Sequence, residues 1–216
     1  MFTRCVRAVL LFFYHLQGWK LEGGGPQSRR CIIIGAPHTT NWDFIFFAGA
    51  THELGLHAGF MGKDTLFRWP MGRFMREMGG VPVVRSSRQN YVEQMIEAFR
   101  TRDELMLVIA PEGTRKQARR WKSGFYHIAV GAGVPIVLGW LDYNTRRGGL
   151  GPEMMMTGDY PADMARIRAF YEERLPGHPQ LAAITAGDES DDRDPAHQRR
   201  ADRRAHAGAV RAGGAD

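Results

Sequence analysis

A histidine and an aspartate, His38 and Asp43, lie on one short stretch that begins at Pro37. The stretch follows an apolar run at residues 31–34, whose composition predicts a buried strand. An imidazole with a carboxylate nearby, on a loop that leaves a strand, is how a fold presents an oriented general base. The carboxylate would fix the tautomer and stabilise the imidazolium. The alternative is that Asp43 only caps the helix expected after it.

A second polar cluster, Glu112 to Arg115, follows another apolar run at residues 105–110. Two such runs, each ended by a turn that contains glycine or proline and carries charge, predict buried strands of a parallel or mixed sheet. Ligands bind such sheets beyond the carboxyl ends of the strands. Together the clusters would place a base, its orienting carboxylate, an acid and a guanidinium in one crevice. For Glu112 and Arg115, a local ion pair across the turn is the alternative.

Four segments of the chain resemble, in order and spacing, four motifs of the glycerolipid acyltransferase superfamily, typified by 1-acyl-sn-glycerol-3-phosphate acyltransferase. In chain order they are His38-x4-Asp43, Gly79 to Arg85, Pro111 to Arg115 and Gly133 to Val137. Two departures from the family pattern are Pro37, where an Asn commonly stands, and Ala110, where an aromatic residue often stands. Neither departure removes a chemical group from the site.

The resemblance implies direct transfer of a fatty acyl chain from acyl-CoA or acyl carrier protein to the hydroxyl of a lysophospholipid. The default acceptor is 1-acyl-glycerol 3-phosphate, which gives phosphatidic acid; other lysolipids and glycerol 3-phosphate itself stay open. His38 would be the base and Asp43 its orienting partner, with no metal and no resident cofactor. Roles in substrate binding are implied for Lys63, Arg85, Glu112, Gly113, Thr114 and Arg115.

Two other classes of function remain open. One is a metal-dependent hydrolase or thioesterase that uses His38, Asp43, Asp64 and Glu112, although one histidine with scattered carboxylates is a poor transition-metal set. The other is a noncatalytic membrane protein that binds lipid, against which the intact site residues argue. A serine acyl-enzyme and an ATP-driven step are poorly supported, because the sequence has no Gly-x-Ser-x-Gly elbow and no Walker loop.

The elements around these residues predict one α/β domain: a central mixed or parallel sheet flanked by helices, an N-terminal amphipathic helix and a disordered C-terminal tail. A chain of 216 residues with 44% hydrophobic residues is sufficient for such a domain. Further strands are expected near residues 19–22, 58–61, 81–84, 134–141 and, at a sheet edge, 154–156. Helices are expected near residues 43–54, 86–99, 123–131 and 162–175.

The predicted division is an interfacial helix at 1–18, the acyltransferase domain at 19–180 and the tail at 181–216. The apolar run from Ala8 to Tyr14 is far shorter than the ~20 residues that cross a bilayer. Its helical spacing and basic flanks favour a position on a membrane surface, with a helix packed on the core as the alternative. The tail is poor in bulky apolar residues and cannot offset its ordering entropy.

Charge and cysteine content favour a membrane surface in a reducing compartment. The formal net charge of +6 favours an anionic lipid surface. No nucleic-acid partner is expected, because the basic residues do not alternate with aromatic ones. Two cysteines make no disulfide framework. The basic run from Arg115 to Lys122 would bind lipid headgroups or an acidic carrier protein, or would be a solvated loop. The predicted location is peripheral, on the cytoplasmic face of the cytoplasmic membrane.

Overall fold

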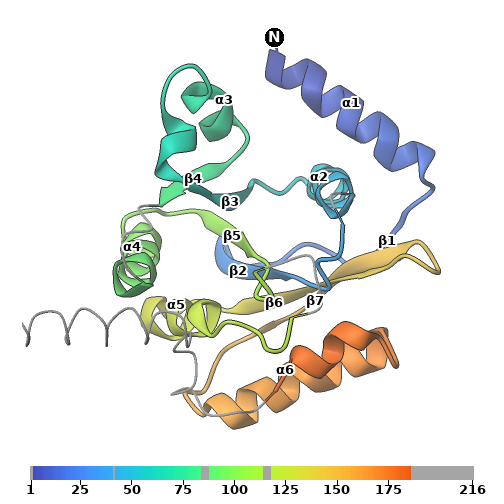
Figure 1. Ribbon diagram of the computed structural model, residues 1–216, viewed down its shortest axis with the longest axis vertical. Helices are drawn as coiled ribbons and strands as arrows, with labels where there is room; N and C mark the ends of the chain where they lie inside the picture. The colour runs from blue at the N-terminus through green and yellow to red at the C-terminus, as the bar shows by residue number, and fades with distance from the viewer. Residues whose placement is uncertain (1, 41, 84–87, 114–117, 186–216) are drawn as a thin grey trace, which may run out of the picture. The chain divides into compact units, whose positions relative to one another are not determined.

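The computed structural model describes residues 2–40, 42–83, 88–113 and 118–185, and within these ranges seven strands form one sheet. In chain order the strands are β1 (Lys20–Glu22), β2 (Arg30–Gly35), β3 (Ala58–Lys63), β4 (Gly80–Val83), β5 (Leu105–Ile109), β6 (Ile136–Asp142) and β7 (Arg147–Met154). Their order across the sheet is β1-β7-β6-β2-β5-β3-β4 (Figure 1). Neighbouring strands pair in parallel, except that β6 and β7 are antiparallel.

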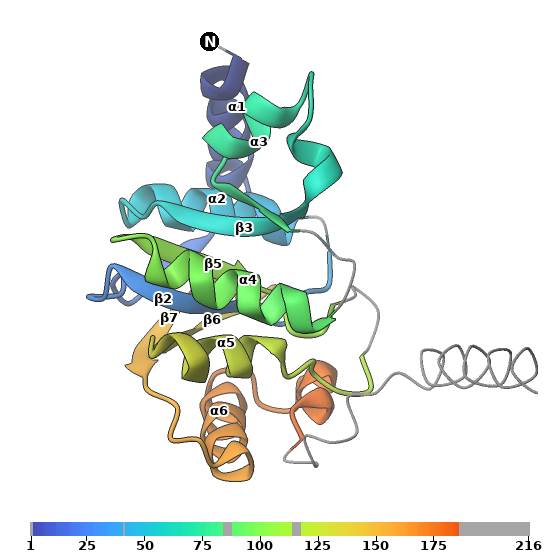
Figure 2. The ribbon, with the colours of Figure 1, turned by 90° about the vertical axis from the view of Figure 1, so that its left-hand side faces the viewer.

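Helices cover both faces of the sheet, as Figures 1 and 2 show. On one face lie α4 (Arg88–Arg100), α5 (Gly124–Ala132) and α6 (Tyr160–Arg174). On the other lie α1 (Phe2–Leu16) and α2 (Asp43–Glu53). The shorter elements are α3 (Gly72–Glu77) and two 3-10 helices, η1 (Asp64–Phe67) and η2 (Pro179–Ala183). The predicted α/β domain with a mixed sheet between helices is confirmed.

The central strand β2 is buried on both of its faces, which explains why its apolar run is unbroken. Ile32 and Ile34 belong to the main core, together with residues of α4, α5 and α6. Cys31 and Ile33 belong to a second cluster on the opposite face, since successive side chains of a strand alternate. Burial raises the pKa of the Cys31 thiol to about 12, so this cysteine is a neutral core residue.

The chain reverses its direction across the sheet at β2 and β5. From β2 it runs through α2 to β3, which lies beyond β5. From β5 it runs through α5 to β6, which lies on the other side of β2. The connecting helices α2 and α5 cover opposite faces (Figure 1). In open α/β sheets, ligands bind outside the carboxyl ends of the strands at such a reversal point.

The strand predicted at the sheet edge near 154–156 is different in the structure. β7 begins at Arg147 and lies between β6 and β1, so the edge strand on this side is β1. The sequence did not predict β7, because its glycines give no alternation of apolar and polar residues. One of them is required by packing: a Cβ on Gly149 would lie 2.1 Å from the carbonyl oxygen of Glu22 in β1.

The predicted tail begins too early in the chain. Leu181, Ala183 and Ile184 are buried in the main core, because this short stretch still supplies apolar side chains. Residues 186–216, for which disorder is predicted, lie outside the described residues. The division into domains otherwise stays a prediction. Of the helices that the structure describes, none has the length and apolarity needed to cross a membrane.

Candidate active site

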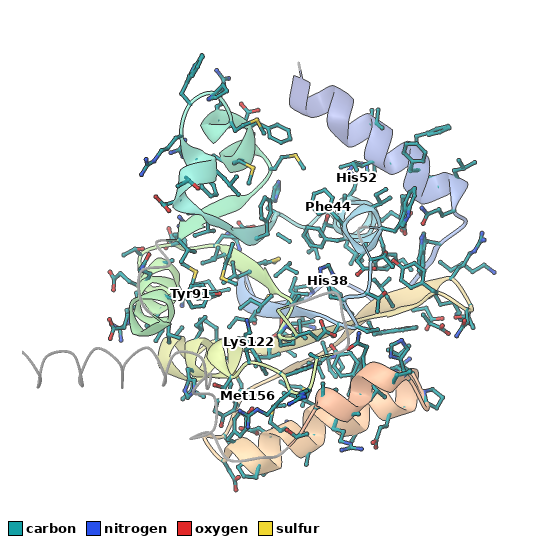
Figure 3. All side chains as sticks on the ribbon, in the orientation of Figure 1. His38, Phe44, His52, Tyr91, Lys122 and Met156 are labelled. Carbon is teal, nitrogen blue, oxygen red and sulfur yellow. The ribbon has the colours of Figure 1, made fainter. Side chains whose placement is uncertain are left out.

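The predicted pair of His38 and Asp43 is in contact. His38 lies between the end of β2 and the start of α2 (Figure 3). Its Nδ1 is 2.8 Å from Oδ2 of Asp43, and the imidazole side chain is 33% exposed while the carboxylate side chain is 9% exposed. The buried carboxylate therefore favours a proton on Nδ1, and Nε2 is on the far edge of the ring.

The carboxylate of Asp43 is held by groups from two parts of the chain. Oδ2 accepts the backbone N–H of Thr39 at 2.8 Å and of Thr40 at 3.0 Å. Oδ1 accepts the hydroxyls of Thr40, at 3.2 Å, and of Tyr143. Burial alone would raise the pKa of Asp43, but hydrogen bonds from His38, Tyr143, Thr40 and Thr39 outweigh it and lower the pKa. Asp43 is therefore ionised at neutral pH.

Asp43 does not cap its helix. The N-cap position of α2 is Trp42, which makes no side-chain capping bond, and Asp43 is the first helical residue. The N–H groups that its carboxylate accepts belong to the preceding loop rather than to the helix. The interpretation of Asp43 as a cap and nothing more is therefore wrong.

Glu112 lies beside His38 because β5 and β2 are parallel neighbours whose carboxyl ends meet. Its side chain is 3% exposed, and its two carboxylate oxygens are 3.1 and 3.2 Å from the backbone nitrogen of His38, whose N–H they accept. Burial raises the pKa of Glu112 to about 7, against the lowering effect of His38. Glu112 thus fixes the backbone that carries the imidazole, a contact that the sequence did not predict.

Lys122 adds a cation next to Gly113. Lys122, labelled in Figure 3, lies just before α5. Its backbone N–H donates to the carbonyl of Pro111 at 2.9 Å, which ties this segment to the Glu112 loop. Gly113 has a φ of 63°, and a Cβ placed there would lie 2.7 Å from Nζ of Lys122. The sequence reading included Lys122 only as the end of a basic run, because nothing in that run distinguishes one cation from another.

Four of the predicted binding residues are described only in part or not at all. Arg85, Thr114 and Arg115 lie outside the described residues. Lys63 is the last residue of β3, and its side chain is also outside the described part. The predicted clamp on a substrate phosphate therefore stays a prediction.

Tyr143 is a site residue that the sequence reading missed. It follows β6, which pairs in parallel with β2 on the side away from β5. The carboxyl ends of three neighbouring parallel strands thus carry Glu112, His38 and Tyr143. The sequence could have indicated Tyr143, since a strand was expected up to residue 141. Polar residues just beyond the carboxyl end of a strand were the reason for choosing His38 and Glu112, and the same reason applies to Tyr143.

The metal-site hypothesis groups His38, Asp43, Glu112 and Asp64. Asp64 begins η1, directly after β3, and pairs with Arg68 at 3.3 Å. In the part of the chain that the structure describes, no three His, Cys, Asp or Glu side chains gather as a metal site requires.

A family model described as Acyltransferase matches residues 24–138, which include both strand-end motifs. The match covers more than half of the chain, so this protein belongs to the Acyltransferase family, within the glycerolipid acyltransferase superfamily. This membership favours acyl transfer over metal-dependent hydrolysis.

Two similar proteins have more specific descriptions. The chain is 31% identical over 134 residues to the 1-acyl-sn-glycerol-3-phosphate acyltransferase of Haemophilus influenzae. That match covers 57% of this chain and 54% of the relative, so the chain spans about half the relative's length. The fold is similar to the crystal structure of the 1-acyl-sn-glycerophosphate (LPA) acyltransferase, PlsC, from Thermotoga maritima. The TM-score is 0.51 at 17% identity, over 80% of this chain and 78% of that one.

Proposed function

We propose that this chain transfers a fatty acyl group from a thioester to the hydroxyl of 1-acyl-glycerol 3-phosphate, which yields phosphatidic acid. The observation that carries this proposal is the contact between Nδ1 of His38 and the buried carboxylate of Asp43, at the reversal point of the sheet. The acceptor is taken from the name of the Haemophilus influenzae relative.

In this reaction Nε2 of His38 takes the proton of the acceptor hydroxyl as its oxygen attacks the thioester carbonyl. Asp43, ionised and hydrogen-bonded to Nδ1, stabilises the imidazolium that forms. The tetrahedral intermediate collapses with loss of the thiolate, which takes the proton from His38. Base catalysis of this kind contributes typically about 10²- to 10⁴-fold, so the positioning of both substrates supplies much of the remainder.

The donor is acyl-CoA or an acylated carrier protein, and no resident cofactor is needed. Arg85 and Arg115 would bind the acceptor phosphate, since a guanidinium group makes bidentate hydrogen bonds to phosphate. Lys63 would add a positive charge to the same site. Thr114 and Gly113 belong to the same binding loop. Lys122 joins this set because its ammonium lies over Gly113. A cation there would attract the anionic headgroup or the phosphates of the donor.

The acceptor and product are lipids, and α1 has the surface expected of a helix that binds a bilayer. One of its faces packs on α2, where the Tyr14 hydroxyl donates to Glu53 at 3.0 Å. Large apolar side chains elsewhere on α1 are exposed to water, among them Phe12 at 61% and Leu16 at 66%. The packing on α2 matches one of the two alternatives that the sequence left open, and the exposed apolar side chains support our proposal that the rest of the helix surface binds a membrane. We place the protein peripherally on an anionic membrane, at the cytoplasmic face.

The test compares wild-type protein with His38→Ala and with His52→Ala, a matched control whose exposed imidazole lies in the last turn of α2. Each protein is incubated with lysophosphatidic acid and a long-chain acyl-CoA in mixed micelles. Free thiol and phosphatidic acid are measured together. We expect equal amounts of both products from wild type and His52→Ala, and a loss of about 10²- to 10⁴-fold in His38→Ala.

Other outcomes separate the alternatives. Release of thiol without lipid product would support a thioesterase. Equal turnover by His38→Ala and wild type would remove the base from the mechanism. Absence of turnover with acyl-CoA calls for acyl carrier protein as donor, and inactivity with both donors, with lipid binding retained, would support the noncatalytic protein.

A further inference from the structure

Tyr143 is the group that joins the third strand end to the catalytic pair. Its hydroxyl donates to Oδ1 of Asp43 and lies 3.1 Å from Oγ1 of Thr40. Oδ2 of the same carboxylate faces the imidazole of His38. The two oxygens of Asp43 therefore have separate partners, one on the side of the base and one on the side of β6.

The ring of Tyr143 is held in place independently of this hydrogen bond. It packs edge-to-face on Trp19, with ring centroids 5.1 Å apart at 80°. The turn after it is fixed by Asp142, whose carboxylate accepts the N–H of Asn144 at 2.9 Å and the hydroxyl of Thr145 at 2.7 Å. The hydroxyl is thus carried by a ring and a turn that have contacts of their own, which a group that orients another one requires.

We propose that Tyr143 is a positioning residue for acyl transfer: its hydroxyl fixes the carboxylate of Asp43 and, through it, the orientation of His38. This inference rests on the proposed function. Without the hydroxyl, Oδ1 keeps only the weaker contact with Thr40, so the carboxylate is held less firmly while Oδ2 still faces Nδ1. Tyr143 acts on the base and not on the acceptor, so its loss lowers kcat and leaves KM nearly unchanged.

The loss of the hydroxyl also changes the proton affinity of the base. A carboxylate with one donor fewer keeps more negative charge for the imidazolium, so the pKa of His38 rises. Among the described residues, the titratable groups that contact the pair are Glu112 from β5 and Tyr143 from β6. Glu112, whose pKa is about 7, is present in both wild type and Tyr143→Phe, so the comparison of the two isolates the effect of the Tyr143 hydroxyl. The acidic limb of kcat/KM therefore moves to higher pH in Tyr143→Phe.

The experiment compares Tyr143→Phe with Tyr126→Phe. Tyr126 is a control with the same chemistry, since its hydroxyl donates to the carboxylate of Asp163 in α6. That carboxylate also accepts the N–H and the hydroxyl of Thr157, and neither Tyr126 nor Thr157 belongs to the catalytic pair. We expect a loss of kcat of about tenfold in Tyr143→Phe, the usual effect of one hydrogen bond to a charged group. We expect neither a loss of kcat nor a shifted acidic limb in Tyr126→Phe.

A double-mutant cycle shows whether Tyr143 acts through Asp43. In an Asp43→Ala background, Tyr143→Phe should cost almost nothing further, because the carboxylate that it orients is absent. Equal losses in both backgrounds would overturn the proposal, as would a raised KM with unchanged kcat, which would make Tyr143 a substrate-binding residue.

A readout without substrate separates this proposal from the proposed function. The ¹⁵N resonances of His38 report its tautomer and its pKa in the free protein. Tyr143→Phe should raise that pKa while Tyr126→Phe leaves it unchanged. This result would stand even if no acyl acceptor were turned over, whereas an unchanged His38 titration in Tyr143→Phe would overturn the positioning role.

Discussion

Replacement of Glu112 by glutamine should change how the stability of the protein depends on pH. Burial raises the pKa of this carboxyl from 4.5 to about 7 in the folded protein. Between these values the folded state holds a proton that the unfolded state has released. The stability contribution of Glu112 is therefore full below pH 4.5 and is lost as the pH rises through 7. Glutamine stays neutral and has no such loss.

The size of the effect follows from the change in pKa. One pKa unit corresponds to about 1.4 kcal/mol, so the change from 4.5 to about 7 corresponds to roughly 3 kcal/mol. Relative to wild type, Glu112→Gln should become more stable as the pH rises from 4.5 to 8, by up to about 3 kcal/mol. Any loss of the hydrogen bond to the His38 backbone adds an offset that does not depend on pH.

The assay is urea unfolding of both proteins at several pH values from 4.5 to 8, read as the difference in the free energy of unfolding. Glu153→Gln is a control of opposite sign. The carboxylate of Glu153 accepts the N–H and hydroxyl of Ser28 at 2.6 and 2.7 Å, which lowers its pKa. Its stabilisation is present above pH 4.5 and lost as the pH falls. A difference for Glu112→Gln that stays constant across this range would refute the burial argument.

Three further predictions concern the pair of His38 and Asp43, the exposed surface of α1, and the packing of α1 on α2. Asp43→Asn should lower kcat by about 10²- to 10⁴-fold with the fold intact by circular dichroism, because the imidazolium loses its counter-charge; a loss below threefold would contradict this. Phe12→Ser should weaken sedimentation with anionic vesicles, whereas Met155→Ser, also exposed, should not. Gly49→Ala should destabilise the protein by about 1–3 kcal/mol in urea unfolding, because its Cβ would lie 2.2 Å from the Tyr14 ring; an unchanged midpoint would show that α1 readily moves aside.

The catalytic pair was predictable because its chemistry is local in the sequence. Only a short loop separates His38 from Asp43, and the apolar runs at β2 and β5 could be recognised from composition alone. The partners of that pair were not predictable in the same way. Glu112 and Tyr143 are 74 and 100 residues away from the groups that they bond, so their contacts depend on the order of strands in the sheet.

The sequence predicts several strands but not their order. For Glu112 the sequence implied a role in substrate binding, or a local ion pair with Arg115. It could not show the contact with the His38 backbone, because that contact depends on β5 lying directly beside β2. The glycine-rich β7 was placed wrongly for a related reason. The strand β7 pairs with β1, whose backbone approaches the glycines of β7 closely because they carry no side chain. The pattern of apolar residues in a sequence contains no information on such contacts.

The helix α2 begins at the catalytic carboxylate and also packs on α1. This arrangement has a consequence for the energetics of a lipid substrate. Asp43 begins α2, and the adjacent Trp42 packs on Phe13 of α1 with ring centroids 6.1 Å apart. If α1 rests on a bilayer, the start of α2, which carries Asp43, is close to the bilayer surface. The acceptor can then present its hydroxyl to His38 while its hydrocarbon tail stays among other tails. Extraction into water costs about 0.8 kcal/mol for each CH₂, roughly 12 kcal/mol for a 16-carbon chain. Such an enzyme never has to provide that energy, and its product is already in the membrane when it is released.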